Sequence, residues 1–187
     1  GTNSDSALSS HDHPAAVELE VARVRKLLQE RRYAEGLQAT TALLVTVPGN
    51  RDVLYLRAQA ERLLGDIPAA LQTLTGLEQL HPRFSRLYQE RGQCHVVLKQ
   101  ASQAIDAFLR GVRINPALPA SWSMLEGLYR MTGQAANAAE AREPTAHQHL
   151  AVDDQLFAKR TRSHPDRPLA IARLKITFPQ IRRLEHV

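Results

Sequence analysis

The 187 residues carry 24 Lys and Arg against 19 Asp and Glu, and 43% of them are hydrophobic. This composition fits one globular domain with a sizeable core and excludes a disordered chain. No apolar run approaches the ~20 residues of a membrane helix, so we predict no membrane contact. Aromatic residues make up only 5%, which favours helices over a β-sandwich. The one cysteine, Cys94, excludes an internal disulfide and fits a reducing cytoplasm.

Residues 1–16 are expected to be a disordered lead, because they are rich in Ser and Asp. They begin with Gly1-Thr2 and no methionine, as a cloning remnant does. The lead contains His11 and His13, and a second pair, His147 and His149, lies far along the chain. Two imidazoles at i and i+2 diverge on a helix and have no cysteine or carboxylate cluster beside them. We therefore predict no metal site.

A repeat of 34 residues runs through residues 17–152, and Pro48, Pro82 and Pro116 mark it at position 32 of successive units. Position 20 is small in every unit, and position 15 falls in the turn between two helices. The residues at position 20 are Gly36, Ala70, Ala104 and Ala138, and those at position 15 are Arg31, Gly65, Lys99 and Gly133. A fixed period of this length predicts stacked pairs of helices.

The third unit shows the pattern of one helix pair. Helices are predicted over 85–98 and 102–114, and Gly92 and Ala104 are small enough to let the two backbones approach closely. In the second helix, four apolar residues lie at i, i+3, i+4 and i+7 and form one stripe. They are Ile105, Phe108, Leu109 and Val112. Pro116 follows the predicted helix end because proline cannot continue a helix.

The last two units carry the most specific residues. Unit 85–118 has Tyr88, Gly92, Ala104, Phe108 and Pro116, and unit 119–152 has Trp122, Leu125, Tyr129, Gly133 and Ala138. With these residues the chain resembles a tetratricopeptide repeat (TPR) protein over about 17–150. The resemblance implies an all-α fold, a right-handed α-solenoid of about four helix pairs with C-terminal capping helices. It also implies that the large aromatic residues belong to the core.

In such solenoids the first helices of the pairs line a concave groove. Positions 2, 5, 9 and 12 of each unit face this groove, and here they are rich in Arg and Gln and nearly free of acids. The candidate partner-binding residues are Arg25, Tyr55, Gln59, Arg62, Arg86, Gln89, Gln93 and Arg130. Glutamine can donate hydrogen bonds to a peptide backbone and accept them from it, and arginine binds carboxylates through two parallel hydrogen bonds. We therefore expect a protein or peptide partner of acidic character, the alternative being ordinary solvated helix faces.

Residues 85–139 further resemble the repeat region that precedes the sulfotransferase domain in certain bacterial proteins. In those proteins the repeats are N-terminal and catalysis is C-terminal. This chain shows no glycine-rich strand–loop–helix stretch that could bind a nucleotide phosphate. We therefore predict no cofactor, no small-molecule substrate and no catalytic residue in it.

Residues 153–187 are expected to form basic capping helices or a tail. Residues 156–187 hold eight Lys and Arg against two Asp and Glu, net +6, while the other 155 residues sum to −1. A basic segment can contact nucleic acid. However, Leu169, Ala172 and Ile176 form an apolar stripe, and aromatic stacking groups are scarce. A capping helix is the favoured interpretation, and nucleic-acid binding is disfavoured.

The sequence therefore predicts a bacterial, cytoplasmic, non-catalytic scaffold that binds a peptide or partner helix in its TPR groove. Two alternatives stay open. The chain could be the substrate-recruiting N-terminal part of a larger sulfotransferase, or it could bind nucleic acid through its basic tail.

Overall fold

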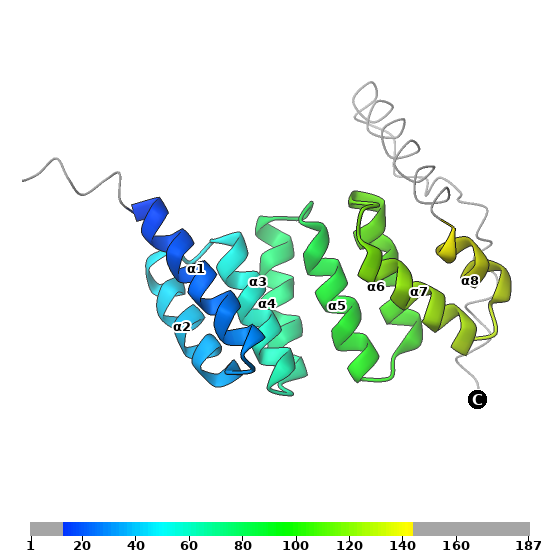
Figure 1. Cartoon of the computed structure of the whole chain (residues 1–187), viewed down its shortest axis with the longest axis horizontal. Helices are drawn as coiled ribbons and strands as arrows, with labels where there is room; N and C mark the ends of the chain where they lie inside the picture. The colour runs from blue at the N-terminus through cyan, green and yellow to red at the C-terminus, as the bar shows by residue number, and fades with distance from the viewer. Residues whose placement is uncertain (1–12, 144–187) are drawn as a thin grey trace, which may run out of the picture. The chain divides into compact units, whose positions relative to one another are not determined.

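The computed structural model describes residues 13–143, which form eight α-helices and, within that range, no strand (Figure 1). The helices are α1 (His13–Gln29), α2 (Tyr33–Thr46), α3 (Arg51–Leu63), α4 (Ile67–Leu80), α5 (Ser85–Val97), α6 (Ala101–Ile114), α7 (Pro119–Met131) and α8 (Ala135–Arg142). The predicted histidine pair at 147 and 149 and the basic segment 153–187 lie outside the described residues. None of the eight helices is both long and apolar enough to cross a membrane.

The helix starts confirm the 34-residue repeat. We call α1, α3, α5 and α7 the A helices, and α2, α4, α6 and α8 the B helices. The B helices begin at residues 33, 67, 101 and 135, and the last three A helices begin at 51, 85 and 119. The first A helix, α1, begins at His13, four residues before the predicted start of the repeats at 17.

The described residues fall into two compact units. Unit 1 comprises residues 13–83 with α1 to α4, and unit 2 comprises residues 84–143 with α5 to α8. In each unit, every A helix packs against the B helix that follows it, and the first B helix packs against the second A helix. Each unit therefore contains two TPR-like helix pairs.

The turn from A helix to B helix has the same backbone in all four repeats. Position 15 adopts a left-handed conformation in each of them, with φ of 61° at Arg31, 89° at Gly65, 58° at Lys99 and 73° at Gly133. Around Gly65, the Asp66 N–H donates to the Glu61 carbonyl at 2.9 Å and the Gly65 N–H donates to the Arg62 carbonyl at 2.9 Å. The other three turns repeat both bonds. This pattern is the Schellman motif, which satisfies the last carbonyls of each A helix.

Unit 2 has an aromatic core. Its buried cluster includes Phe108 at 0%, Trp122 at 7% and Tyr129 at 4% exposure. Burial raises the pKa of Tyr129 to about 12. The ring of Phe108 lies so close to Gly92 that a Cβ there would stand 2.7 Å from two ring atoms. Gly92 was expected to let the two helix backbones approach, and the atoms nearest to it are those of the Phe108 ring, so the missing side chain makes room for this ring.

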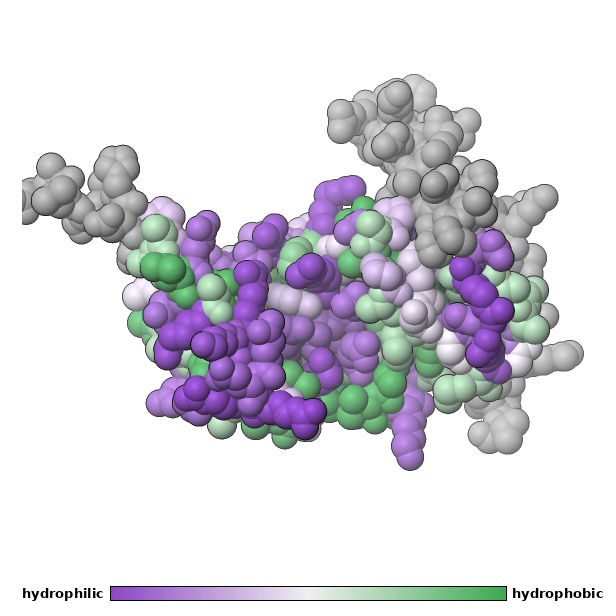
Figure 2. Space-filling view, viewed as in Figure 1, coloured by the Kyte–Doolittle hydropathy of each residue, from purple (hydrophilic) through white to green (hydrophobic). Residues whose placement is uncertain are grey.

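In unit 1, one buried cluster consists of the aliphatic residues Val21, Val24, Val53 and Leu56. Ile67, Leu74 and Leu77 of α4 are also buried. The four small residues at position 20 are buried in both units, as predicted. Cys94 is fully buried, as is typical of a structural thiol. Figure 2 shows hydrophilic side chains over much of α1, and apolar ones near the C-terminal end of α5, where Val97 is 55% exposed.

Candidate partner-binding surface on the A helices

The eight predicted partner-binding residues all lie on A helices, four in each unit. In unit 1 they are Arg25 on α1 and Tyr55, Gln59 and Arg62 on α3. In unit 2 they are Arg86, Gln89 and Gln93 on α5 and Arg130 on α7. Their surroundings differ strongly between the two units.

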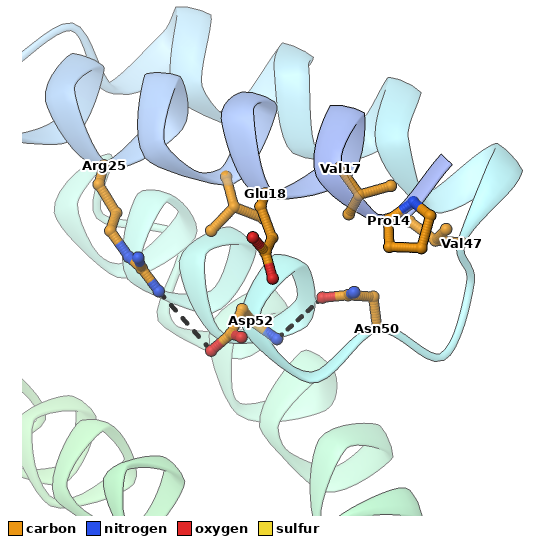
Figure 3. Close-up of a pocket in the computed structure, with 8 residues that line it drawn as sticks. Pro14, Val17, Glu18, Arg25, Val47, Asn50 and Asp52 are labelled. Atoms are coloured by element: carbon orange, nitrogen blue, oxygen red, sulfur yellow. Dashed lines mark hydrogen bonds and ion pairs between the residues drawn. The ribbon is translucent and has the colours of Figure 1, made fainter. Parts of the chain in front are cut away.

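Unit 1 contains an open cavity of about 620 Å³ between α1, the α2–α3 connection and the first turn of α3 (Figure 3). Its lining combines aliphatic and charged side chains. The lining residues are Pro14, Val17, Glu18, Val21, Arg25, Val47, Asn50 and Asp52. Glu18, Val21 and Arg25 occupy positions 2, 5 and 9 of the first repeat, and Asp52 occupies position 2 of the second. The register expected to face a ligand therefore converges on this cavity.

The α3 end of the cavity is held by a helix cap. Asn50 precedes α3, and its side-chain oxygen accepts from the backbone N–H groups of Asp52 and Val53, each at 3.0 Å. An Asn in this place satisfies two N–H groups that the first helical turn leaves unpaired. The cap fixes the backbone of Asp52, so its carboxylate is directed toward α1 (Figure 3).

Charged groups form the rim of the cavity. Arg25 Nη2 lies 3.8 Å from Asp52 Oδ1, and Arg51 Nη2 lies 3.4 Å from Asp52 Oδ2. Glu18 extends from α1 toward the same carboxylate (Figure 3). Within residues 13–143, Glu18 makes no hydrogen bond or ion pair. Among the described residues, Asp52 is therefore a carboxylate approached by two arginines, and Glu18 is a carboxylate that forms no ion pair.

The remaining predicted residues of unit 1 have internal partners. Tyr55 is only 9% exposed, and its hydroxyl accepts from Gln59 Nε2 at 3.1 Å. Arg62 is half-buried and also has an interaction of its own. The ring of Tyr55 thus belongs to the packing of α3 and offers a ligand little surface.

In unit 2, α5 offers the more accessible polar groups. Arg86 is exposed and Gln93 is half-buried, and neither has a hydrogen-bond or ion-pair partner among the described residues. Gln89 is different, because its Oε1 accepts from the hydroxyl of the buried Ser121 at 3.0 Å. On α7, Gly127 is exposed, and a Cβ there would meet nothing within 4 Å. Part of the surface of α7 is therefore open backbone.

Arg130 on α7 is engaged by an acid on its own helix. Its Nη2 lies 2.9 Å from Glu126 Oε1, and the same oxygen accepts from Arg142 Nη2 at 2.6 Å and Nε at 2.9 Å. The hydrogen bond from Arg142 lowers the pKa of Glu126. Arg130 therefore meets a ligand as part of a three-residue ion cluster that contains one carboxylate.

The groove positions were expected to be nearly free of acids, with Asp52 as the one acid among them. Glu18 and Asp52 both line the cavity of unit 1. Glu18 stands at position 2 of its repeat, in register with Asp52 and Arg86, so applying the register to the first repeat would have found it. Glu61 is 3% exposed and accepts from Arg57 Nε at 2.8 Å and from Thr73 Oγ1 at 2.7 Å, which makes it a structural acid. No three His, Cys, Asp or Glu side chains of residues 13–143 come together as metal ligands.

No family model and no curated protein matches the sequence. Solved structures do match. The type III secretion translocator chaperone SycD of Yersinia enterocolitica aligns with a TM-score of 0.60 at 13% identity, covering 71% of this chain and 97% of that chain. TTC0263, a thermophilic TPR protein of Thermus thermophilus, aligns with a TM-score of 0.59 at 21% identity, covering 77% and 78%. PcrH, solved in complex with the chaperone-binding region of PopD, aligns with a TM-score of 0.54 at 18% identity, covering 73% and 98%.

These likenesses show the fold. The chain has the all-α helical repeat fold of TPR proteins, as the sequence predicted. The finer resemblance of residues 85–139 to the repeat region of bacterial sulfotransferases is not shown by these matches. The bacterial and cytoplasmic setting likewise stays a prediction from the sequence.

Proposed function

We propose that this chain is a non-catalytic interaction module that binds a peptide or a partner helix on the A-helix faces of its repeats. The cavity of unit 1 is the observation that carries the proposal. It is open, its volume of about 620 Å³ lies within the roughly 300–1,000 Å³ usual for ligand sites, and it combines an aliphatic wall with a charged rim. An aliphatic wall can bury a ligand side chain, while the rim orients it.

The surface of α5 supplies a second set of contacts for the same role. Arg86 and Gln93 occupy positions 2 and 9 of the third repeat and are accessible. Their guanidinium and amide groups can bond to a peptide backbone or to a carbonyl-bearing side chain. Gln89 is held in place by Ser121, so it can use its N–H groups without first losing side-chain freedom. Pre-oriented groups of this kind bind at lower entropic cost.

The solved structures support this choice of function. One of the similar proteins is described as a translocator chaperone, and another was solved with a segment of the protein PopD. Helical repeats of this kind present extended surfaces on which peptides and partner helices bind, so partner binding through the A helices suits the fold.

The test is to select binding peptides from a displayed random library against the full chain and to map one of them by NMR. Amide shifts concentrated on α1, α3, α5 and α7 are expected. The double substitution R86A/Q93A should weaken a peptide that contacts α5 by about tenfold, since losing about 1.4 kcal/mol of polar contact has that effect. Q103A/D106A changes two exposed residues of α6 and serves as the matched control. Shifts confined to the B helices, or a library that yields no binder, would contradict the proposal.

A further inference from the structure

We propose that the cavity of unit 1 takes a basic amphipathic segment of the partner, with an aliphatic side chain against its valines and a Lys or Arg on Glu18. This inference rests on the proposed function and adds the chemical class of the partner. It departs from the acidic peptide that the Arg and Gln residues of the whole lining suggested.

The aliphatic half of the cavity comes from three valines and a proline. Val21 is 6% exposed and forms part of the packed core, while Val17 and Val47 are half-buried. Pro14 lies at the outer end beside Val17 (Figure 3). A leucine, isoleucine or valine side chain that covers these groups removes apolar surface of both partners from water, which favours binding. Hydroxyl, amide and aromatic groups are absent from this part of the lining.

The charged side chains at the rim determine which charge the ligand should carry beside its aliphatic group. Asp52 is already approached by two guanidinium groups, Arg25 at 3.8 Å and Arg51 at 3.4 Å. Glu18 forms no ion pair within the described part of the chain. Among the charged lining residues, two carboxylates, Glu18 and Asp52, stand against the one guanidinium group of Arg25, so the lining carries a net negative charge. A carboxylate of the partner would meet the carboxylate of Glu18, and like charges at short range repel. An ammonium or guanidinium group would instead complete an ion pair with Glu18 and lie near Asp52.

Three synthetic peptides of equal length test this specificity on the 187-residue chain. The first places one leucine beside one lysine in a neutral background, the second replaces the lysine by glutamate, and the third replaces the leucine by serine. NMR titration should show the first peptide shifting amides of α1 and of the first turn of α3. It should bind about fivefold tighter than either of the others, as one partly exposed ion pair or one buried aliphatic group allows. The advantage of lysine over glutamate should shrink as salt is added.

The variant E18Q should remove most of the preference for lysine and leave the leucine preference intact. Because Glu18 is exposed and has no partner in residues 13–143, the thermal melt of E18Q should match that of the unsubstituted chain. E20Q is the matched control. Glu20 lies on the same helix but bonds to Arg23 at 3.0 Å and does not line the cavity, so the preference should be unchanged in this variant.

Each other outcome overturns the inference. Equal binding of the lysine and glutamate peptides, a preference for glutamate, or a lysine preference that survives E18Q would remove Glu18 from the recognition. Shifts of the α1 amides on simple dilution, before any peptide is added, would assign the cavity to a second copy of the chain. If library peptides bind to the A helices but show none of the lysine preference, only this inference fails. If no peptide of any kind shifts an A helix, the proposed function fails with it.

Discussion

Unit 1 and unit 2 are built on one repeat, yet they pack it with different side chains. At position 4 of the A helices, unit 2 has Tyr88 and Trp122, which are 3% and 7% exposed. Unit 1 has Glu20 and Leu54 at this position, and both are half-buried. Nevertheless the B helices of both units start in the same register and their turns share one backbone conformation. The repeat pattern therefore fixes helices and turns, while the size of the packing residues decides how firmly each unit is filled.

The largest expected difference between the units concerns their central side chains. Phe108 and Val24 are both fully buried, but the phenyl ring leaves a larger cavity when it is removed. F108A should lower the free energy of unfolding by about 3–5 kcal/mol, and V24A by about 2 kcal/mol. Urea unfolding followed by circular dichroism measures both losses. Fluorescence of Trp122, the single tryptophan, reports on unit 2 alone. Equal losses would show that the Phe108 ring contributes no more to stability than the side chain of Val24.

A second comparison places a methyl group at one tight glycine of each unit. At Gly92 the new Cβ would stand 2.7 Å from two ring atoms of the buried Phe108, whereas at Gly36 the nearest atom is the terminal Leu28 Cδ2 at 2.8 Å. A buried ring cannot turn away, but the end of a half-buried leucine can. G92A should therefore destabilise by about 1–2 kcal/mol even after the helical gain of alanine, and G36A should change stability by less than about 0.5 kcal/mol. A larger loss for G36A in the same urea experiment would reverse the ranking of the two packings.

The A–B turns allow a smaller test in which both units should behave alike. Arg31 and Lys99 adopt positive φ with side chains that disfavour it, while Gly65 and Gly133 adopt it without strain. R31G and K99G should each stabilise by about 0.5–1 kcal/mol, and G65A and G133A should each destabilise by about 1 kcal/mol. A Cβ at Gly65 or Gly133 meets nothing within 4 Å, so the effect on thermal unfolding would report the backbone alone. Opposite signs in the two units would mean that the turns are not equivalent.

The smallest expected effects come from one exposed ion pair in each unit. The hydrogen bond from Arg142 lowers the pKa of Glu126 in unit 2, and the hydrogen bonds from Arg32 lower the pKa of Glu35 in unit 1. A carboxyl group with a lowered folded pKa stabilises the fold above its unfolded pKa, and this contribution is lost as the pH falls through the folded pKa. Denaturation midpoints measured from neutral pH down to about pH 3 should therefore fall less steeply in R142A and in R32A. If neither substitution alters how the denaturation midpoint changes with pH, these exposed ion pairs do not contribute to the stability of the fold.

Much of the fold could be predicted because its determinants are local or periodic. Pro48, Pro82 and Pro116 recur at one interval and mark the ends of the B-helix segments. The third helix pair was expected at 85–98 and 102–114 and is found at Ser85–Val97 and Ala101–Ile114. The left-handed backbone of the A–B turn could be predicted from the sequence in only two repeats, because glycine occupies position 15 in only two of the four. Arg31 and Lys99 adopt the same φ because the flanking helices impose it.

The candidate surface was less predictable, because register says which residues face one way and not which of them are already engaged. The bond between Gln89 and Ser121 joins residues 32 apart, and the bond between Arg142 and Glu126 joins residues 16 apart. Such pairs form only when two helices pack, so a single-helix pattern does not reveal them. The same holds for the buried acid Glu61, whose partner Thr73 lies on the next helix.

By itself the sequence determined the repeat, the helix boundaries to within a few residues and the small residues at the helix crossings, since periodic burial and turn geometry are written in consecutive residues. Only the tertiary structure decided which charges remain unpaired. Within residues 13–143, Asp52 is paired with two arginines and Glu18 forms no ion pair, although both occupy position 2 of their repeats. Arg51 is the chain neighbour of Asp52 on α3, but the Arg25–Asp52 pair joins side chains of separate helices, and its distance exists only once α1 and α3 have packed together.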